Sequence, residues 1–314
     1  MIKYFNTDGI LTNQETDKTI VTEWNNQFSI KNDNIATDMD FKLINLTFKS
    51  ADNLFGSVQN MYDKLMTKST MTSYAGINAE IKISKEEFEK WLNLKKSTET
   101  HKFLYYYDFQ SLVGSLQNLV SESRFLLCDF YKTLNENSFM IIENPQNIDG
   151  LMFATGRLVT SIFAKINHLF INLNSQLDFI TKIAYELENF PKDFNTYPKM
   201  KSNKILFGDA KKIKNSNLKN TIFDKTDNTK LIISLRNEII HNASFENIQK
   251  VYQLFSNNIM TEKFILIPDN TNGNFDTYKN RNRFFNNDVK LNEILPKIVT
   301  EFWKEMETTI MKLA

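Results

Sequence analysis

The sequence predicts a mainly α-helical protein, and two observations support that prediction. Glycine and proline are scarce, with 8 and 5 occurrences in 314 residues, so few positions interrupt a helix. Long stretches also place apolar side chains at mixed spacings of three and four residues, which is the period of a buried helix face. The length is compatible with two domains or with one elaborated domain.

The first hundred residues predict a helix-rich region with minor β structure. Residues 38–66 have helical period, and residues 79–83 are typical of a short strand. Ser84 and Glu87 then fit a capping box that opens a helix ending near Leu94. The polar stretch 95–100 is the predicted boundary between an N-terminal region, residues 1–100, and a helical domain, residues 101–314. No motif assigns a role to the N-terminal region.

Two long helices are predicted next. Residues 102–134 fit one largely buried helix, and the break at 143–147 contains Pro145, which pushes the residue before it out of the helical region. Residues 151–190 repeat the pattern until Pro191 ends it. A helix of that length would span about 60 Å, so a kink or a short interruption is also compatible with the pattern.

The stretch 194–228 lacks clear periodicity and is strongly basic. It contains Pro198 and Gly208, and its acidic residues are only Asp209, Asp224 and Asp227. Its lysines are Lys199, Lys201, Lys204, Lys211, Lys212, Lys214, Lys219 and Lys225. Two interpretations stay open, namely a solvated loop or a basic rim beside an RNA-binding site.

Shorter elements follow this basic segment. Residues 229–241 predict a helix with Asp227 or Asn228 as its N-cap, and residues 242–244 can turn the chain into a second short helix at 245–255. Residues 264–268 are typical of a short strand, and an asparagine-rich loop continues through Gly273. Residues 289–313 predict a closing helix, in which Pro296 marks either the effective start or a bend.

Composition limits the possible functions. The net charge of +1 gives no overall field that would attract nucleic acid, so any such attraction must be local. Cys128, the single cysteine, excludes an internal disulfide and a multi-cysteine zinc site, and its apolar neighbours predict a buried, inert thiol. No signal-peptide h-region or long apolar run is found, which predicts a cytoplasmic protein without a membrane span. No metal motif is present, so neither a metal nor a cofactor is expected.

The stretch 234–242, Ser-Leu-Arg-Asn-Glu-Ile-Ile-His-Asn, contains the main candidate residues. On one straight helix Asn237 and His241 point within about 40° of each other, whereas Arg236 and His241 diverge by about 140°. Arg236 and His241 can therefore meet at one phosphate only in two ways. Either the start of the helix is distorted around the motif, or a second copy faces it across a two-fold symmetric interface.

Arginine and histidine together can cleave RNA. Attack of a ribose 2′-hydroxyl on the neighbouring phosphorus needs a base and an acid with a pKa near neutrality, and histidine can serve as both. Arginine is permanently charged and can hold two phosphate oxygens. Taken alone the spacing is a weak signal, because a solvated arginine and a histidine at a helix C-terminus explain it as well.

Arg236-Asn237-Glu238-Ile239-Ile240-His241 resembles the Arg-Asn-x-x-x-His signature of the HEPN superfamily. Leu235 before the arginine and the two isoleucines before the histidine also fit, as does the order of two long helices and then a short motif helix. The likeness covers roughly residues 102–255. It implies a helical bundle with long antiparallel helices and, in many members, a metal-independent ribonuclease of toxin, abortive-infection or CRISPR systems. By the same resemblance Arg236 and His241 are catalytic, and Asn237 positions the phosphate or the histidine.

Several other residues are weaker candidates. Asp178, a polar residue in the second long helix, either supports Arg236 or points to solvent. Glu238 is expected to be solvated. His168 is expected on a helix surface or in the core, and His101 has no partner nearby in sequence. Residues 278–285 mix cations with aromatic rings, as a surface that follows a nucleic-acid strand could, but rank below the lysine-rich segment.

Two functional hypotheses follow. The first is a metal-independent endoribonuclease that acts as a homodimer in phage defence or as a toxin, with Lys211, Lys212, Lys214 and Lys219 binding RNA and an antitoxin or regulatory partner possible. The alternative is a non-catalytic HEPN-like module that binds RNA, nucleotide or a protein partner. The near-neutral net charge slightly favours this alternative. A structural protein of a phage or plasmid would explain the composition but would give residues 236–241 no role.

Overall fold

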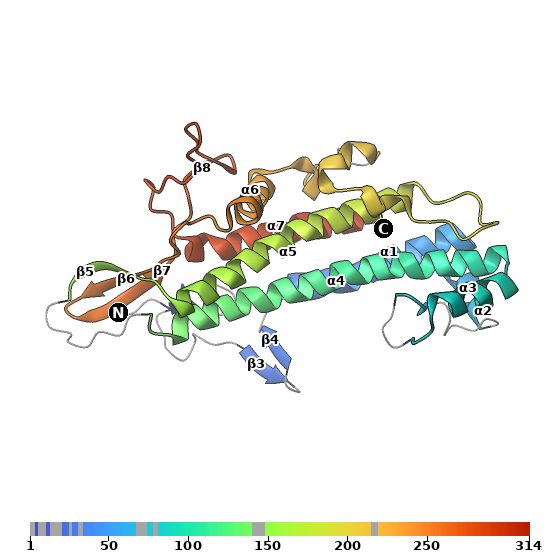
Figure 1. The fold of residues 1–314 in the computed structure, drawn as a ribbon, viewed down its shortest axis with the longest axis horizontal. Helices are drawn as coiled ribbons and strands as arrows, with labels where there is room; N and C mark the ends of the chain where they lie inside the picture. The colour runs from blue at the N-terminus through green and yellow to red at the C-terminus, as the bar shows by residue number, and fades with distance from the viewer. Residues whose placement is uncertain are drawn as a thin grey trace. The chain divides into compact units, whose positions relative to one another are not determined.

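The computed structural model describes residues 34–66, 74–77, 81–139, 148–214 and 219–314, together with the backbone of short strands before residue 31. The described residues are mostly helical, with small antiparallel sheets, so the predicted mainly α class is confirmed (Figure 1). Before residue 31, β1 (Tyr4–Phe5) pairs with β2 (Leu11–Thr12), and β3 (Val21–Trp24) pairs with β4 (Gln27–Ile30).

The helical structure predicted for residues 38–66 is confirmed, and it is divided between two helices. Helix α1 (Asn34–Phe55) is followed directly by Gly56, whose φ of 84° lies in the left-handed region that favours glycine. Helix α2 (Val58–Leu65) then begins with Ser57 as its N-cap, since the Ser57 hydroxyl accepts a hydrogen bond from Asn60 N at 3.0 Å.

The predicted capping box of the next helix is confirmed. Helix α3 (Lys85–Leu94) opens with Glu87 N donating to Ser84 Oγ at 3.1 Å, and Ser84 N donates to Glu87 Oε2 at 2.8 Å. The short strand expected just before it is not formed by residues 81–83, and residues 79 and 80 lie outside the described residues.

Both long helices are confirmed as α4 (Thr98–Glu136) and α5 (Arg157–Glu188). Lys165 of α5 donates to Thr133 of α4 at 2.6 Å, and Asn172 donates to Glu122 at 2.9 Å, so the helices run antiparallel at these contacts. The interruption considered for the second helix is found at its start, where β5 (Gly150–Ala154) precedes it.

The chain divides into two compact units, each built from separate segments of sequence. Unit 1 comprises Met1–Thr37, Leu119–Ser175 and Lys225–Met306. Unit 2 comprises Asp38–Asn118, Gln176–Asp224 and Glu307–Ala314. The boundary expected near residue 100 stays a prediction.

In unit 2 the basic segment is packed rather than merely solvated. It contains the short 3-10 helices Lys201–Lys204, Phe207–Lys212 and Ile222–Asp224. Their apolar side chains are buried, and carboxylates of α5 accept hydrogen bonds from their backbone amides. Ser202 N donates to Glu186 at 2.7 Å, Phe207 N donates to Asp178 at 2.8 Å, and Lys214 N donates to Glu188 at 2.7 Å. The solvated-loop interpretation therefore holds only for the lysine side chains, several of which are exposed.

In unit 1 the short helix predicted at 245–255 is wrong. Residues Val251–Ser256 form β6, which lies between β5 and β7 (Ile259–Phe264) in an antiparallel sheet. Val251, Gln253 and Phe255 are buried and alternate with more exposed residues, which is the period of a strand. The turn after β6 is Asn257-Asn258 with φ of 51° and 65°, a hairpin signal that the sequence interpretation missed. The strand predicted at residues 264–268 is also misplaced, because β7 ends at Phe264.

The closing helix is confirmed as α7 (Leu291–Leu313). Pro296 lies inside it rather than at its start, so the interpretation of Pro296 as the effective start is wrong. Tyr131 of α4 donates its hydroxyl to Asn292 O of α7 at 2.7 Å, which ties the two helices together within unit 1.

A hairpin of β8 (Asn270–Thr271) and β9 (Asn274–Phe275) packs against the first turns of α6 (Asp227–Asn242). Its turn contains Gly273 with φ of 78°. A Cβ atom at Gly273 would lie 2.1 Å from Asp227 O and 2.9 Å from Leu231 N. The close approach of the hairpin to α6 therefore requires glycine at this position.

We expect Gly273→Ala to lower the free energy of unfolding by about 2–4 kcal/mol, because backbone strain and a steric clash with α6 add together. Urea unfolding followed by circular dichroism measures the change. Gly150→Ala is the matched control, since Gly150 has φ of 90° but no atom within 4 Å of its added Cβ. Equal losses in the two variants would contradict the importance of the contact with α6.

Candidate functional site

Helix α6 is held firmly on one side. Its N-cap is Thr226 rather than the predicted Asp227 or Asn228, because Thr226 Oγ1 accepts a hydrogen bond from Thr229 N at 3.2 Å. Glu305 of α7 accepts from the hydroxyls of Thr226 and Thr229 at 3.0 and 3.1 Å. The buried apolar face of α6 consists of Leu231, Ile232, Leu235 and Ile239. These contacts fix the orientation of α6, and so they also fix which of its side chains face away from the core.

The opposite side of α6 exposes the motif. Asn237 and His241 are exposed, Arg236 is partly exposed, and the apolar side chain of Ile240 is 50% exposed. Arg236 Nη1 donates to Asn237 Oδ1 at 3.1 Å. The helix is unbroken from Asp227 to Asn242, so the interpretation that it is distorted around the motif is wrong.

The unbroken helix fixes the relative directions of the motif side chains. At 100° per residue, Asn237 and His241 share one side and Arg236 and Ile240 share another, each pair about 40° apart. Arg236 and His241 remain about 140° apart. One copy of the chain therefore does not direct both side chains at the same phosphate.

The His241 ring has no hydrogen-bond or ion-pair partner in the described part of the chain. It lies in the last turn of α6, which ends at Ala243 with φ of 65°. The ring is exposed and can be reached from solvent.

Glu238 is buried, and the expectation that it is solvated is wrong. Its side chain is 11% exposed and accepts hydrogen bonds from Arg283 Nη2 at 3.2 Å, from Asn242 Nδ2 at 2.9 Å and from Asn282. Its charge is thus compensated by a loop more than 40 residues later in the sequence.

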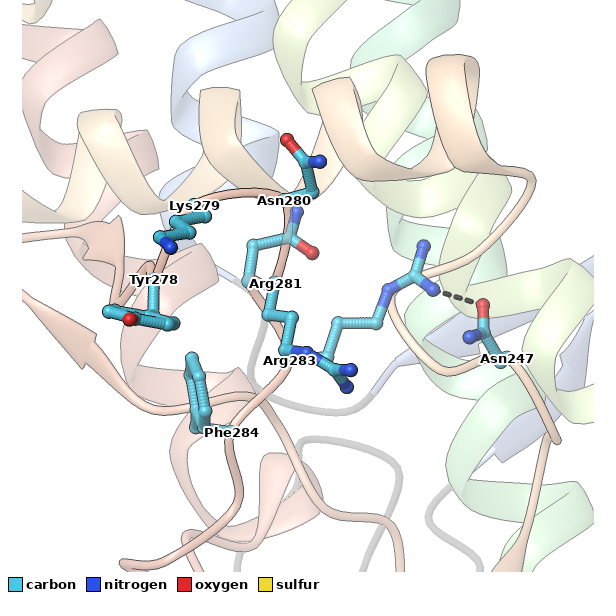
Figure 2. Close-up of a pocket in the computed structure, with 8 residues that line it drawn as sticks. Asn247, Tyr278, Lys279, Asn280, Arg281, Arg283 and Phe284 are labelled. Carbon is cyan, nitrogen blue, oxygen red and sulfur yellow. Dashed lines mark hydrogen bonds between the residues drawn. The ribbon is translucent and has the colours of Figure 1, made fainter.

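That loop, residues 278–284, surrounds a hollow of about 590 Å³ next to the turn after α6 (Figure 2). The lining residues are Asn247, Tyr278, Lys279, Asn280, Arg281, Asn282, Arg283 and Phe284. Arg283 also donates to Ser244 O at 3.0 Å and to Asn247, the latter drawn as a dashed line in Figure 2. As a nucleic-acid surface, this loop was expected to matter less than the lysine-rich segment. The structure nevertheless attaches the loop to α6, the helix that carries the motif.

The turn itself is stabilised by a second buried ion pair. Lys250 lies 2.7 Å from Glu246, whose side chain is 5% exposed. Burial raises the pKa of the Glu246 carboxyl, and the Lys250 ammonium opposes that rise.

The other predicted site residues belong to unit 2. The Asp178 carboxylate is half-buried and accepts from Phe207 N at 2.8 Å, so it orders the basic segment. Its proposed support of Arg236 stays a prediction. Lys211, Lys212, Lys214 and Lys219 are exposed, and Lys212 pairs with Asp209 at 2.9 Å.

The remaining candidates have local structural roles. His101 is buried with Nδ1 2.8 Å from Phe194 O, and His168 is a half-exposed partner of Glu122 at 3.4 Å. Cys128 is buried, as predicted. Among the described residues, no group of three or more histidine, cysteine, aspartate or glutamate side chains could hold a metal ion. Within the same residues, no helix is long and apolar enough to cross a membrane.

Comparison with protein-family models, with curated proteins and with solved structures finds no match to this chain. Functional inference therefore depends on the geometry of α6 and the segments attached to it.

Proposed function

We propose that this protein is a metal-independent endoribonuclease of the HEPN type, with Arg236, Asn237 and His241 in its active site. The observation that carries the proposal is the exposed face of α6, where these three side chains stand on a rigid helix and the His241 ring has no partner among the described residues.

The same face supports a homodimer with a composite site. Arg236 and His241 diverge on an unbroken helix, so one copy cannot direct both side chains at the same phosphate. A second copy must therefore supply one of the two. Ile240 is half-exposed between them and gives the face an apolar centre that a second copy would cover. Two copies of α6 would then place two histidines and two arginines along one cleft.

In this site the reaction needs only protein side chains and the RNA. His241 accepts the proton of the 2′-hydroxyl while O2′ forms a bond to phosphorus, and the bond from phosphorus to the 5′-oxygen breaks. The leaving oxygen then takes up this proton from the His241 imidazolium, so one histidine serves first as base and then as acid. Arg236 neutralises the charge that develops on the phosphoryl oxygens, and Asn237 orients the phosphate or the ring. The products are a 2′,3′-cyclic phosphate and a 5′-hydroxyl.

The remaining parts of the proposal follow the resemblance. Lys211, Lys212, Lys214 and Lys219 would hold RNA phosphates, and Asp178 would support Arg236. A nuclease of this kind would act in phage defence or as a toxin and would need control by an antitoxin or another regulatory partner.

We expect cleavage of a single-stranded RNA by the purified protein to continue in excess chelator and to stop when the scissile 2′-hydroxyl is replaced by hydrogen. The reason is that O2′ is the nucleophile and no metal-bound water takes part. Gel analysis of an end-labelled oligonucleotide measures both results, and a cyclic phosphate on the product identifies the mechanism. Cleavage of the 2′-deoxy substrate at the same rate would contradict the proposal.

The alternative is a non-catalytic helical module that binds RNA, nucleotide or a protein partner. The near-neutral net charge of +1 favours it. Expression of the wild type and of His241→Ala in growing cells distinguishes the nuclease from the binding module. A growth defect that disappears in His241→Ala supports the nuclease, and equal tolerance of both proteins supports the binding module.

A further inference from the structure

The loop at residues 278–284 presents cations and aromatic rings at its surface. Lys279 and Arg281 are exposed, and no carboxylate among the described residues pairs with them. Tyr278 is 63% exposed and Phe284 is 39% exposed. Figure 2 shows both rings on the side of the hollow away from Asn247. Two cations without a carboxylate partner and two partly exposed rings therefore border one hollow. The Lys279 ammonium lies 5.4 Å from the centroid of the Tyr278 ring, so these two side chains already form a cation–aromatic pair.

The backbone of the loop holds Lys279 in a tight turn. Tyr278 N donates to Arg281 O at 2.7 Å and Arg281 N donates to Tyr278 O at 2.9 Å, so Lys279 and Asn280 form a tight two-residue turn. Lys279 has φ of 53°, a conformation that glycine or asparagine adopts more easily. The turn therefore leaves the Lys279 side chain exposed at the tip of the loop.

The base of the loop is fixed to α6. Arg283 bridges Glu238, Ser244 O and Asn247, while its Nε atom is buried without a hydrogen-bond partner. Glu238 and His241 are three residues apart and point within about 60° of each other on the helix. The loop thus rises from a point adjacent to the side of α6 that carries His241.

We propose that residues 278–284 bind single-stranded RNA and deliver it to the motif on α6, an inference that rests on the proposed nuclease function. Unpaired bases can stack on Tyr278 and Phe284, while Lys279 and Arg281 hold the adjacent phosphates. Asn280, which also lines the hollow, offers its amide group to base edges. A duplex keeps its bases stacked inside and cannot use these rings, so single-stranded RNA is the substrate class.

The test is binding of a fluorescent, fully 2′-O-methylated single-stranded oligonucleotide, which the proposed reaction cannot cleave, measured by anisotropy. The double variant Lys279→Ala/Arg281→Ala should weaken binding by about 10-fold or more and reduce the dependence of log Kd on log salt by about 1.4, as loss of two phosphate contacts predicts. Tyr278→Ala should also weaken binding by about 5-fold or more.

Two controls separate binding from folding and from total charge. Lys279→Gly removes the charge while relieving the left-handed backbone, so it should be at least as stable to heat as the wild type yet bind more weakly. The double variant Lys85→Ala/Lys297→Ala removes two charges from exposed lysines outside the loop and should bind as the wild type does. Wild-type affinity in the loop variants would overturn the proposal.

Duplex RNA of the same length is the third comparison. Equal affinity for duplex and single strand, with equal dependence on the loop, would overturn the choice of single-stranded RNA. Failure of the nuclease proposal has a different signature, because the wild type would then bind the oligonucleotide through the loop without cleaving unmodified RNA. If the loop variants bind and cleave RNA as the wild type does, the proposed role of the loop is wrong and the nuclease proposal is unaffected.

Discussion

Replacing His241 with alanine is expected to slow RNA cleavage by about 10²–10⁴-fold, since the variant loses the group that moves the proton in the reaction. Arg236→Ala should cause a loss of about 10²-fold or more, because the charge on the transferring phosphoryl group is no longer neutralised. The first-order rate constant for cleavage of a labelled RNA measures both. His241 is exposed, so the fold should not depend on it, and thermal unfolding should stay within about 1 kcal/mol of the wild type.

His168→Ala is the matched control for a general effect of histidine loss. Among the residues that the structure describes, this half-exposed histidine forms an ion pair with Glu122 alone, and its loss should leave cleavage unchanged. Equal rates for His241→Ala and the wild type would refute the catalytic assignment.

A mixture of the two inactive variants tests the composite site. In a mixed dimer one subunit retains Arg236 and the other retains His241, so part of the activity should return if the two residues act across the interface. If the mixture stays inactive while each variant still dimerises, the residues act within one subunit or not at all.

Replacing Glu238 with alanine is expected to have the largest effect on stability near the motif. Arg283 and Asn282 would be left in a largely buried place without their acceptor, which should cost about 2–4 kcal/mol. The loop at residues 278–284 would also lose its attachment to α6. Chemical unfolding measures the first effect, and faster amide exchange or proteolysis within the loop measures the second.

A double-mutant cycle distinguishes this ion pair from ordinary surface charge. Glu238→Ala/Arg283→Met removes both charges and should recover much of the stability lost in Glu238→Ala. Glu89→Ala removes an exposed pair with Lys85, where both side chains are more than half exposed, and should cost no more than about 1 kcal/mol. If Glu238→Ala behaves like Glu89→Ala, then Glu238 does not anchor the loop.

Several predictions from sequence alone are confirmed. The two long helices follow from apolar residues repeated over many turns, and the capping box of α3 follows from Ser84 and Glu87. Each is a local pattern in which neighbouring residues satisfy one another, so no distant partner is needed. The motif helix is predicted for the same reason, although Thr226 caps it.

The errors occur where partners are distant in sequence. Residues 251–256 carry apolar side chains that fit a short helix, but β5 and β7 provide strands on both sides and make them β6. Glu238 has the charge of a surface residue, and only Arg283, 45 residues later, makes its burial possible. An ion pair between residues so far apart produces no periodic pattern in the sequence, so the sequence could not predict it.

The sequence by itself determined the helical class, the order of the long helices and the positions of Arg236, Asn237 and His241 around one helix, because these depend on local period and fixed helix geometry. The tertiary structure decided that the helix is unbroken, that its motif face is exposed, and that the loop at residues 278–284 is attached beside it. These features depend on burial and on ion pairing between distant segments, which follow from packing rather than from local pattern.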